Sequence, residues 1–271
     1  MSEYLLREYC PEDRTALTAL WQRVFGDPLE MIAAFFSALG EMGVGAVAVC
    51  DGRPVGAAYV LDALSLADAA GKEQRCGYLY AVAVDPEHRH HGLGAGLSRK
   101  AASLSLARGA EFICTLPAEP SLYPWYEEIL GLRPALCRQI FPVSAKVGWP
   151  VRQLAAEEYL SRRETLLSGR PHLRPGNAVM DFAGQFFSLF GGGLYACGSG
   201  LCAACMADGR VLIQELIAPE GVAAAELAAS LCAALGCREG RYVLPAAQGE
   251  PYLSAPAGAL PPDCVWNLSF D

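Results

Sequence analysis

The segment of residues 82–96 constrains the fold of this chain more than any other part of the sequence. It reads VAVDPEHRHHGLGAG: an apolar strand pattern stops at Asp85 and Pro86, a basic stretch follows, and glycines open a helical pattern. A glycine-rich turn at a helix start leaves backbone N–H groups without intrahelical partners, and the helix dipole adds partial positive charge there. We therefore expect a strand–turn–helix unit whose turn either binds phosphate or is purely structural.

The flanking sequence alternates between strand and helix patterns, which indicates an α/β chain. Asp51-Gly52 joins two apolar strand patterns and is typical of a type I′ hairpin turn. In chain order we expect a strand at 4–9, helices at 11–25 and 29–39, hairpin strands at 44–50 and 54–61, a strand at 77–84, a helix at 92–107, a strand at 111–116, a helix at 122–130 and a strand at 136–143.

The pattern starts again after Gly148-Trp149-Pro150, so we place a domain boundary there, between residues 1–147 and 148–271. The order of hairpin, long strand, helix and strand in the second part is the order in the middle of the first, which indicates a weak internal repeat. The turn at 218–221 contains a single glycine, so we expect no second phosphate-binding loop. The second part predicts a helix at 154–167, strands at 194–207 and 210–217 separated by Asp208-Gly209, a helix at 222–235 and a strand at 241–244.

The charge and the apolar runs of the chain limit its partners. The formal net charge of −8 argues against binding to a nucleic-acid backbone and mildly favours a cationic substrate. The apolar runs are interrupted well before the roughly 20 residues that a membrane span needs, and the N-terminal residues lack a signal-peptide pattern. We therefore expect a cytoplasmic protein with no nucleic-acid and no membrane partner.

The loop from Arg89 to Ala95 resembles the R/Q-x-x-G-x-G/A loop of the GNAT acetyltransferases, and it follows a V-x-V-x-P strand end as it does in that family. The resemblance covers about residues 1–145. It implies the GNAT fold, a mixed central sheet flanked by helices, followed here by a smaller, degenerate GNAT-like α/β domain that shapes the acceptor site. It also implies that acetyl-CoA binds with its pantetheine beside Val82, Ala83 and Val84, and with its pyrophosphate on the loop residues Arg89, His90, His91, Gly92, Leu93, Gly94 and Ala95.

The resemblance further implies a proton donor for the leaving thiolate. Tyr126 is the best match to the tyrosine that the family places on the helix after the second splayed strand, although it stands five residues before Gly131 and the family pattern has four. A one-residue bulge would absorb the difference, and Tyr123 is the alternative. The implied function is direct transfer of an acetyl group to a primary amine of a small molecule or peptide. The alternative is an acetyl-CoA-binding sensor with little catalysis.

The identity of the general base stays open. The strand before the loop carries Tyr78 and Tyr80 but no Glu or Asp, so a carboxylate of Glu127, Glu128 or the second domain would have to act through water. Asp271 is a further candidate because a C-terminal carboxylate reaches the active site in larger GNAT aminoglycoside acetyltransferases.

Other polar residues have simpler explanations. His88, His90 and His91 do not share one face of a regular element, and Cys202 and Cys205 point to opposite sides of a strand, so we expect no metal site. Glu215 stands in an apolar strand and needs a partner, which is either the substrate or an arginine such as Arg163. Whether the protein forms a homodimer is left open.

Overall fold

The computed structural model describes residues 3–266 and 268 of the chain, and it divides the chain into two compact units. Unit 1 takes the residues up to Ser65, then Gln74–Ala135 and Tyr252–Ala259; unit 2 takes Leu66–Glu73, Leu136–Pro251 and the residues from Leu260 on. Each unit therefore includes a segment that is distant in sequence from the rest of it. The domain boundary at residue 148 remains a prediction. The two units are defined by the contacts within each of them, whereas the predicted boundary marks where the sequence pattern starts again.

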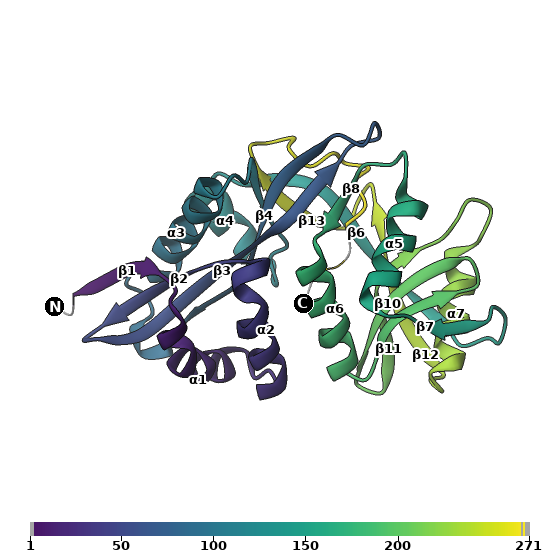
Figure 1. Cartoon of the computed structure of the whole chain (residues 1–271), viewed down its shortest axis with the longest axis horizontal. Helices are drawn as coiled ribbons and strands as arrows, with labels where there is room; N and C mark the ends of the chain where they lie inside the picture. The colour runs from purple at the N-terminus through teal and green to yellow at the C-terminus, as the bar shows by residue number, and fades with distance from the viewer. Residues whose placement is uncertain (1–2, 267, 269–271) are drawn as a thin grey trace. The chain divides into compact units, whose positions relative to one another are not determined.

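Unit 1 is a twisted sheet with helices on both faces (Figure 1). Its strands lie in the order β1-β2-β3-β4-β5-β13, in which β4 and β5 are parallel and β13 is antiparallel to β5. Its elements are β1 (Tyr4–Glu8), the 3-10 turn η1 (Pro11–Asp13), α1 (Arg14–Phe25), α2 (Leu29–Met42), β2 (Gly43–Cys50), β3 (Arg53–Ala67), β4 (Glu73–Val84), η2 (Pro86–His88), α3 (Leu93–Ala107), β5 (Phe112–Thr115), α4 (Leu122–Leu130) and β13 (Glu250–Ala255).

The alternation of β3 side chains shows which helices cover which face of this sheet. Val60 belongs to a core cluster with Leu97 of α3 and Ile129 of α4. Its neighbour Tyr59 points the other way, where its ring centroid lies 5.6 Å from that of Trp21 on α1 and 5.0 Å from that of Phe35 on α2. The two helix pairs therefore bury opposite faces of the sheet, as period-two alternation requires.

Unit 2 repeats much of this arrangement. Its strands lie in the order β6-β12-β11-β10-β9-β7, with β11 and β12 parallel and β6 antiparallel to β12. The elements are β6 (Arg133–Ser144), β7 (Val151–Gln153), α5 (Ala156–Leu167), β8 (His172–Pro175), α6 (Asn177–Leu189), β9 (Gly193–Cys197), β10 (Gly200–Ala207), β11 (Arg210–Ile217), α7 (Ala224–Ala234) and β12 (Glu239–Ala246).

The expected strand–helix–strand pattern is present in both units, as β4-α3-β5 and as β11-α7-β12. Both parallel ladders contain three paired positions. The two Asp-Gly hairpins are also confirmed: Asp51 and Asp208 have φ values of 48° and 51°, and the following glycines have 75° and 73°. Positive φ at both central residues is the requirement of a type I′ turn.

Two predictions for the second half were wrong. The strand expected at 194–207 is two strands, because the chain turns at Gly198, which has a φ of 56°. The helix α6 was not expected at all. Its apolar residues recur at helical spacing and are buried, including Val179, Phe182 and Phe186.

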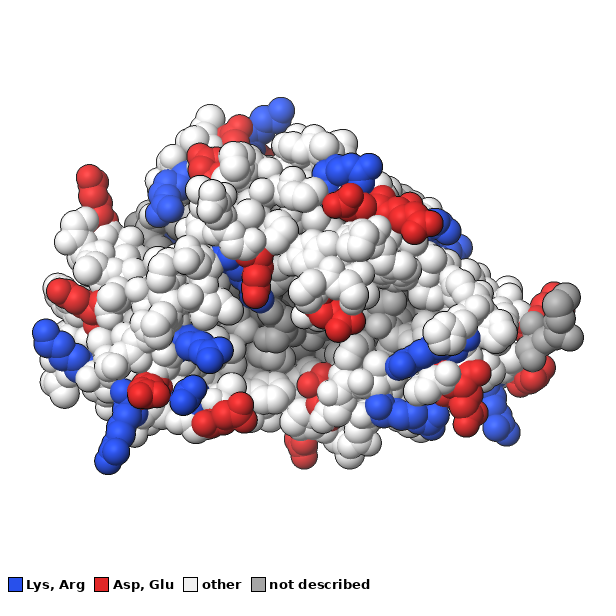
Figure 2. Space-filling view, turned by 180° about the vertical axis from the view of Figure 1, so that it is seen from behind, with Lys and Arg blue, Asp and Glu red and all other residues white. Residues whose placement is uncertain are grey.

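The surface carries charged side chains of both signs. On the face drawn in Figure 2, acidic and basic side chains are interspersed. None of the helices in the described part of the chain is both long enough and apolar enough to cross a membrane.

Candidate active site

The strand β4 changes direction near its end because it contains one extra residue. Ala81 has a φ of 49°, a left-handed conformation that is uncommon for a residue with a side chain. Leu79 and Val82 both pack on the core cluster under α3 and α4, although they are three residues apart. In a regular strand, positions three apart face opposite sides, so the extra residue is a bulge at Ala81. The bulge turns the end of β4, where Val82 and Val84 are half-buried and Ala83 is buried.

The parallel strands β4 and β5 form a fork. Their paired positions are Cys76 with Phe112, Gly77 with Ile113 and Tyr78 with Cys114, and the ladder ends there. Beyond it, the hydroxyl of Thr115 on β5 donates a 2.9 Å hydrogen bond to the carbonyl of Leu79 on β4. The fork thus begins at Thr115 and opens toward the residues that follow Leu79. A splay of these strands was expected from the resemblance, and the structure gives it a defined apex.

The loop after β4 is held by the carboxylate of Asp85. One oxygen accepts a 3.1 Å hydrogen bond from the Glu87 N–H, and the other forms a 2.6 Å ion pair with Arg23 of α1. The Asp85 N–H donates to the carbonyl of Val55 at 2.9 Å, which ties the strand end to β3. Because Arg23 pairs with Asp85, the negative charge of this carboxylate is partly compensated beside the loop.

The N-terminus of α3 presents free backbone donors. Gly92 caps it with a φ of 73°, and His90 before it has a φ of 65°. The Gly96 N–H donates to the Gly92 carbonyl at 3.0 Å, which is the first intrahelical bond. The N–H groups of the preceding helix residues Leu93 to Ala95 have no carbonyl one turn earlier to bind, and they point outward from the helix end. A Cβ at Gly92 would meet no atom within 4 Å, so the space before the helix is open.

The basic side chains of the loop are arranged around this terminus. Arg89 and His90 are exposed, and Arg89 Nε donates a 3.2 Å hydrogen bond to the carbonyl of Val84. His88 Nδ1 lies 3.2 Å from the hydroxyl of Tyr4 on β1, and the His91 ring lies 5.6 Å from the Tyr4 ring. Tyr4 therefore supports the loop from one side. The structure brings all of the predicted loop residues to a single turn.

Tyr126 lies inside unit 1 rather than on its surface. It belongs to the same core cluster as Leu79 and Leu253, and only 7% of it is exposed. Burial raises the pKa of its hydroxyl to about 12. The helix α4 ends with a regular bond from the Gly131 N–H to the Glu127 carbonyl, at 3.0 Å. The last turn therefore contains no bulge that absorbs the extra residue between Tyr126 and Gly131.

The candidates for a general base are not equivalent in the structure. The two tyrosines on the strand before the loop were not themselves candidates: Tyr78 is buried, and the ring of Tyr80 is half-buried, 6.0 Å from that of Trp21 and 5.7 Å from that of Phe35. Glu127 is paired with Arg133 at 3.6 Å. Glu128 is exposed on α4. Asp271 lies outside the described residues.

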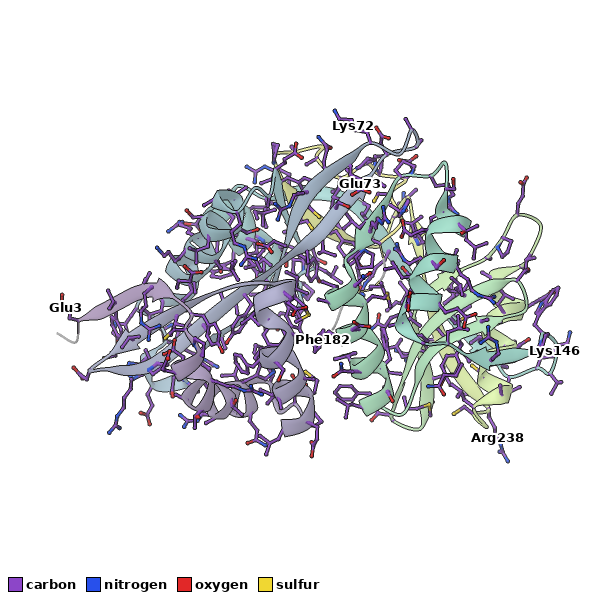
Figure 3. The ribbon with its side chains drawn as sticks, viewed as in Figure 1. Glu3, Lys72, Glu73, Lys146, Phe182 and Arg238 are labelled. Carbon is purple, nitrogen blue, oxygen red and sulfur yellow. The ribbon has the colours of Figure 1, made fainter. Side chains whose placement is uncertain are left out.

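Glu215 of β11, for which two partners were open, binds Arg163 of α5. Arg163 Nε lies 3.0 Å from Glu215 Oε2, and both side chains are fully buried. The hydroxyl of Tyr159 donates to the same carboxylate oxygen at 3.0 Å. The pair continues through Glu164 to His172 and Arg174, and Arg174 reaches Glu73 at 2.7 Å. Figure 3 labels Glu73. Glu215 is therefore the buried end of an ion-pair network that extends to the surface.

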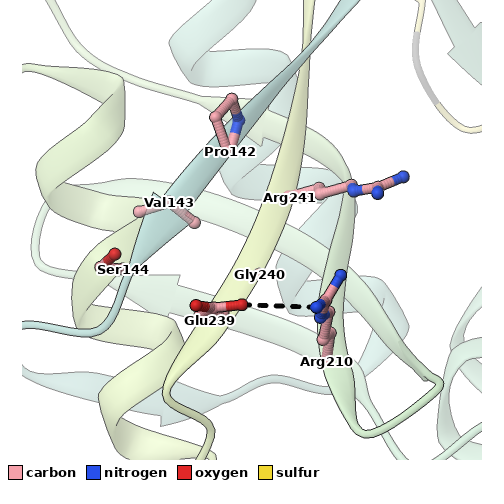
Figure 4. A pocket seen from close by; sticks show the side chains of 7 residues that line it. All are labelled: Pro142, Val143, Ser144, Arg210, Glu239, Gly240 and Arg241. Carbon is pink, nitrogen blue, oxygen red and sulfur yellow. Dashed lines mark ion pairs between the residues drawn. The ribbon is translucent and has the colours of Figure 1, made fainter.

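A second polar feature of unit 2 is a surface pocket of about 340 Å³ (Figure 4). Arg210 and Glu239 line it and form an ion pair at 3.5 Å between side chains that are more than half exposed. It lies where β11 and β12 begin, whereas the fork in unit 1 lies where β4 and β5 part. Among the described residues, no group of His, Cys, Asp or Glu side chains is arranged to hold a metal ion.

Two elements of the site were not found from the sequence. The residue type gives no sign of the bulge at Ala81, because alanine does not favour positive φ. The bridge from Thr115 depends on which residue follows the last paired position, and a sequence does not give register. The carboxylate of Asp85 could have been anticipated, since Asp before Pro-Glu is a common turn-capping pattern.

Residues 6–127 match the family model of the acetyltransferase (GNAT) domain. No curated protein matches the chain in sequence. A GCN5-related N-acetyltransferase from Kribbella flavida is similar in structure over 93% of this chain and 71% of its own, with 17% identity and a TM-score of 0.70.

Two further structures are similar over nearly the whole chain. A probable N-acyltransferase from Enterococcus faecalis V583 is 12% identical, covers 94% of this chain and 72% of its own, and has a TM-score of 0.70. Eis1 from Mycobacterium abscessus is 14% identical, covers 93% and 73%, and has a TM-score of 0.62. At such low identity the likeness shows the fold alone, and that fold is a mixed α/β fold of the GNAT type.

Proposed function

We propose that this chain, whose residues 6–127 belong to the GNAT acetyltransferase family, transfers an acetyl group from acetyl-CoA directly to a primary amine. The proposal rests on two features that lie close together along the chain. The end of β4 forms one side of an open fork, and it leads within a few residues to the free N–H groups of α3. A ligand with a diphosphate and an extended amide-containing arm matches both features.

The residues present fit acetyl-CoA. The N–H groups at the start of α3 suit the pyrophosphate, and Arg89, His90 and His91 add charge around it. Gly92 leaves the approach to these donors open. The backbone of Val82 to Val84, turned by the bulge at Ala81, would hydrogen-bond the pantetheine arm. When bound, acetyl-CoA supplies an acetyl group activated as a thioester.

Tyr126 is proposed to assist departure of the thiolate. The hydroxyl, with a pKa of about 12, is neutral at physiological pH and can therefore donate a hydrogen bond to a ligand. A thiol has a pKa near 8.5, so full proton transfer from Tyr126 to a thiolate is uphill by about 5 kcal/mol. Tyr126 therefore acts best by donating a hydrogen bond to the developing negative charge, and the thiolate takes its final proton from another source.

The acceptor must lose a proton before it attacks. A lysine-like amine with a pKa near 10.4 costs about 4.6 kcal/mol to deprotonate at pH 7. The net charge of −8 favours the approach of such an amine. Much of the acceleration is then expected from holding amine and thioester in line, for which effective molarities reach about 10⁵ M or more. The acceptor is proposed to be a small molecule or a peptide.

Unit 2 is proposed to be a degenerate copy of the same fold. The support is its order of hairpin, long strand, helix and parallel strand, and an extra residue in β11, Gln214, that parallels the bulge of β4. Its helix α7 begins at Ala224, after the N-cap Ala223, with an acidic residue, Glu226, in the first turn. A carboxylate there disfavours an anionic ligand, so unit 2 is not expected to bind a second acetyl-CoA.

The test is release of free CoA thiol during incubation with acetyl-CoA and a panel of amines. Thiol release that depends on one class of amine, and that falls in Tyr126→Phe, supports the enzyme. Binding of acetyl-CoA without turnover on any amine would favour the alternative, a module that senses acetyl-CoA.

A further inference from the structure

The apex of the fork between β4 and β5 is closed by one side chain. After the last paired position, Tyr78 with Cys114, the next residues are Leu79 and Thr115. The strands are joined there by the hydrogen bond from Thr115 Oγ1 to the Leu79 carbonyl, at 2.9 Å. Both residues are only 2% exposed. The side chain of Thr115 therefore occupies the point at which the two strands begin to separate.

The space behind this apex is filled. A Cβ added at Gly77 would lie 2.6 Å from Val60 Cγ1 and 2.8 Å from Ile113 Cδ1, so the sheet one step below is tightly packed. On the other side of β5, Leu253 of β13 is paired with Thr115 and is fully buried. A group that enters the open end of the fork can therefore go no deeper than Thr115.

This apex lies on the same face of the sheet as Tyr126. Leu79, Ile113 and Leu253 belong to the core cluster that contains Tyr126. Thr115 is paired with Leu253 and stands two residues after Ile113, so its side chain shares their face. A thioester placed beside the Tyr126 hydroxyl would direct its acyl chain toward the closed end of the fork.

We propose that Thr115 is a specificity-determining residue that limits the acyl donor to short chains such as acetyl and propionyl. The inference rests on the proposed function, because it assumes that the fork admits the acyl group of an acyl-CoA. Longer chains would have to displace the Thr115 side chain or break its bond to Leu79. A pocket that is already filled discriminates against the first methylene beyond its limit by about 10- to 200-fold.

The test measures the dissociation constants of CoA, acetyl-CoA, propionyl-CoA, butyryl-CoA and hexanoyl-CoA by calorimetry, which needs no knowledge of the acceptor. For the unaltered protein, butyryl-CoA is expected to bind at least about tenfold more weakly than acetyl-CoA. Thr115→Ala opens the apex and should reduce this ratio to about threefold or less. Thr115→Val fills the same volume without the hydrogen bond, so it should keep the discrimination even where the protein is less stable.

Ser254→Ala is the matched control. Ser254 is fully buried on β13 beside Thr115's partner, but it faces the other side of the sheet, and its hydroxyl has no hydrogen-bond partner among the described residues. Its removal should leave the ratio unchanged. Equal binding of all acyl-CoAs to the unaltered protein, or an unchanged ratio in a folded Thr115→Ala variant, would overturn the role of Thr115 and leave the proposed function standing. Failure of CoA itself to bind would contradict both.

Discussion

Trp125 covers one side of Gly94: a Cβ added to Gly94 would lie 3.4 Å from Cζ2 of the indole. The contact joins the first turn of α3, which carries the proposed phosphate site, to the helix that carries Tyr126. The Trp125 ring also packs against Tyr126, with 4.8 Å between ring centroids. A chain of direct contacts therefore runs from the loop to Tyr126, the proposed hydrogen-bond donor, within unit 1.

The two glycines of the loop are expected to respond differently to alanine. Gly92 has a φ of 73°, so Gly92→Ala forces a side chain into the left-handed region and should destabilise the protein by about 1–2 kcal/mol. Gly94 is helical, and a methyl group there makes only ordinary contact with Trp125, so Gly94→Ala should stabilise by about 0.5–1 kcal/mol. Urea unfolding followed by circular dichroism measures both, and equal effects of the two changes would contradict the assigned conformations.

Tyr126→Phe removes the proposed hydrogen-bond donor and keeps the ring that fills the core. We expect kcat to fall by about 10²-fold or more, while the dissociation constant of acetyl-CoA stays within about threefold. Since burial raises the pKa of Tyr126 to about 12, its charged form is disfavoured, and Tyr126 should not contribute an alkaline loss of activity below that pH. Unchanged turnover in Tyr126→Phe would transfer the role to Tyr123, for which Tyr123→Phe is the parallel measurement.

The buried pair of Arg163 and Glu215 is expected to stabilise unit 2 without taking part in the reaction. Glu215→Ala leaves the guanidinium of Arg163 buried beside an empty site, which should cost about 3–5 kcal/mol of unfolding free energy. Glu215→Gln retains an acceptor for Tyr159 and should cost less. Acetyl-CoA affinity should be unchanged in Glu215→Gln. A variant that unfolds normally but loses turnover would instead assign Glu215 to the substrate.

A carboxylate at the junction between β1 and α1 should make the stability of the protein fall in acid. Asp13 is buried and accepts two 2.6 Å hydrogen bonds from Arg7, and these bonds hold the pKa of its carboxyl below the ordinary value. A depressed folded-state pKa contributes stability that is fully present above the unfolded-state value of about 3.9 and is lost as pH falls through the folded-state value.

Asp13→Asn should therefore lower stability at neutral pH, by about 1–3 kcal/mol, and flatten the loss below pH 4. Thermal unfolding across this pH range measures the difference. An acid dependence that is unchanged in Asp13→Asn would contradict this assignment.

The sequence was most informative where a backbone conformation requires a particular residue type. The Asp-Gly turns at 51–52 and 208–209 and the glycine turn before α3 were predicted correctly because glycine is favoured where φ is positive. The Arg163–Glu215 pair was one of two predicted alternatives, since a carboxylate in an apolar strand requires a partner.

Features that depend on tertiary packing could not be predicted in the same way. The bulge at Ala81 and the bridge from Thr115 to Leu79 follow from how three strands meet, and neither residue type marks them. Likewise, nothing in the local pattern of residues 250–255 indicates that β13 pairs with β5, more than a hundred positions earlier in the chain, because strand pairing is set by the whole sheet.

Calorimetric titration with acetyl-CoA tests the central claim most directly, using the unaltered protein beside a Gly92→Glu, Gly94→Glu variant. The proposed site predicts binding in the micromolar range by the unaltered protein and its loss in the variant, because two carboxylates at the start of α3 would repel the pyrophosphate and fill its approach. Absence of binding by the unaltered protein, or equal binding by both, would contradict the assignment of this loop as the acetyl-CoA site.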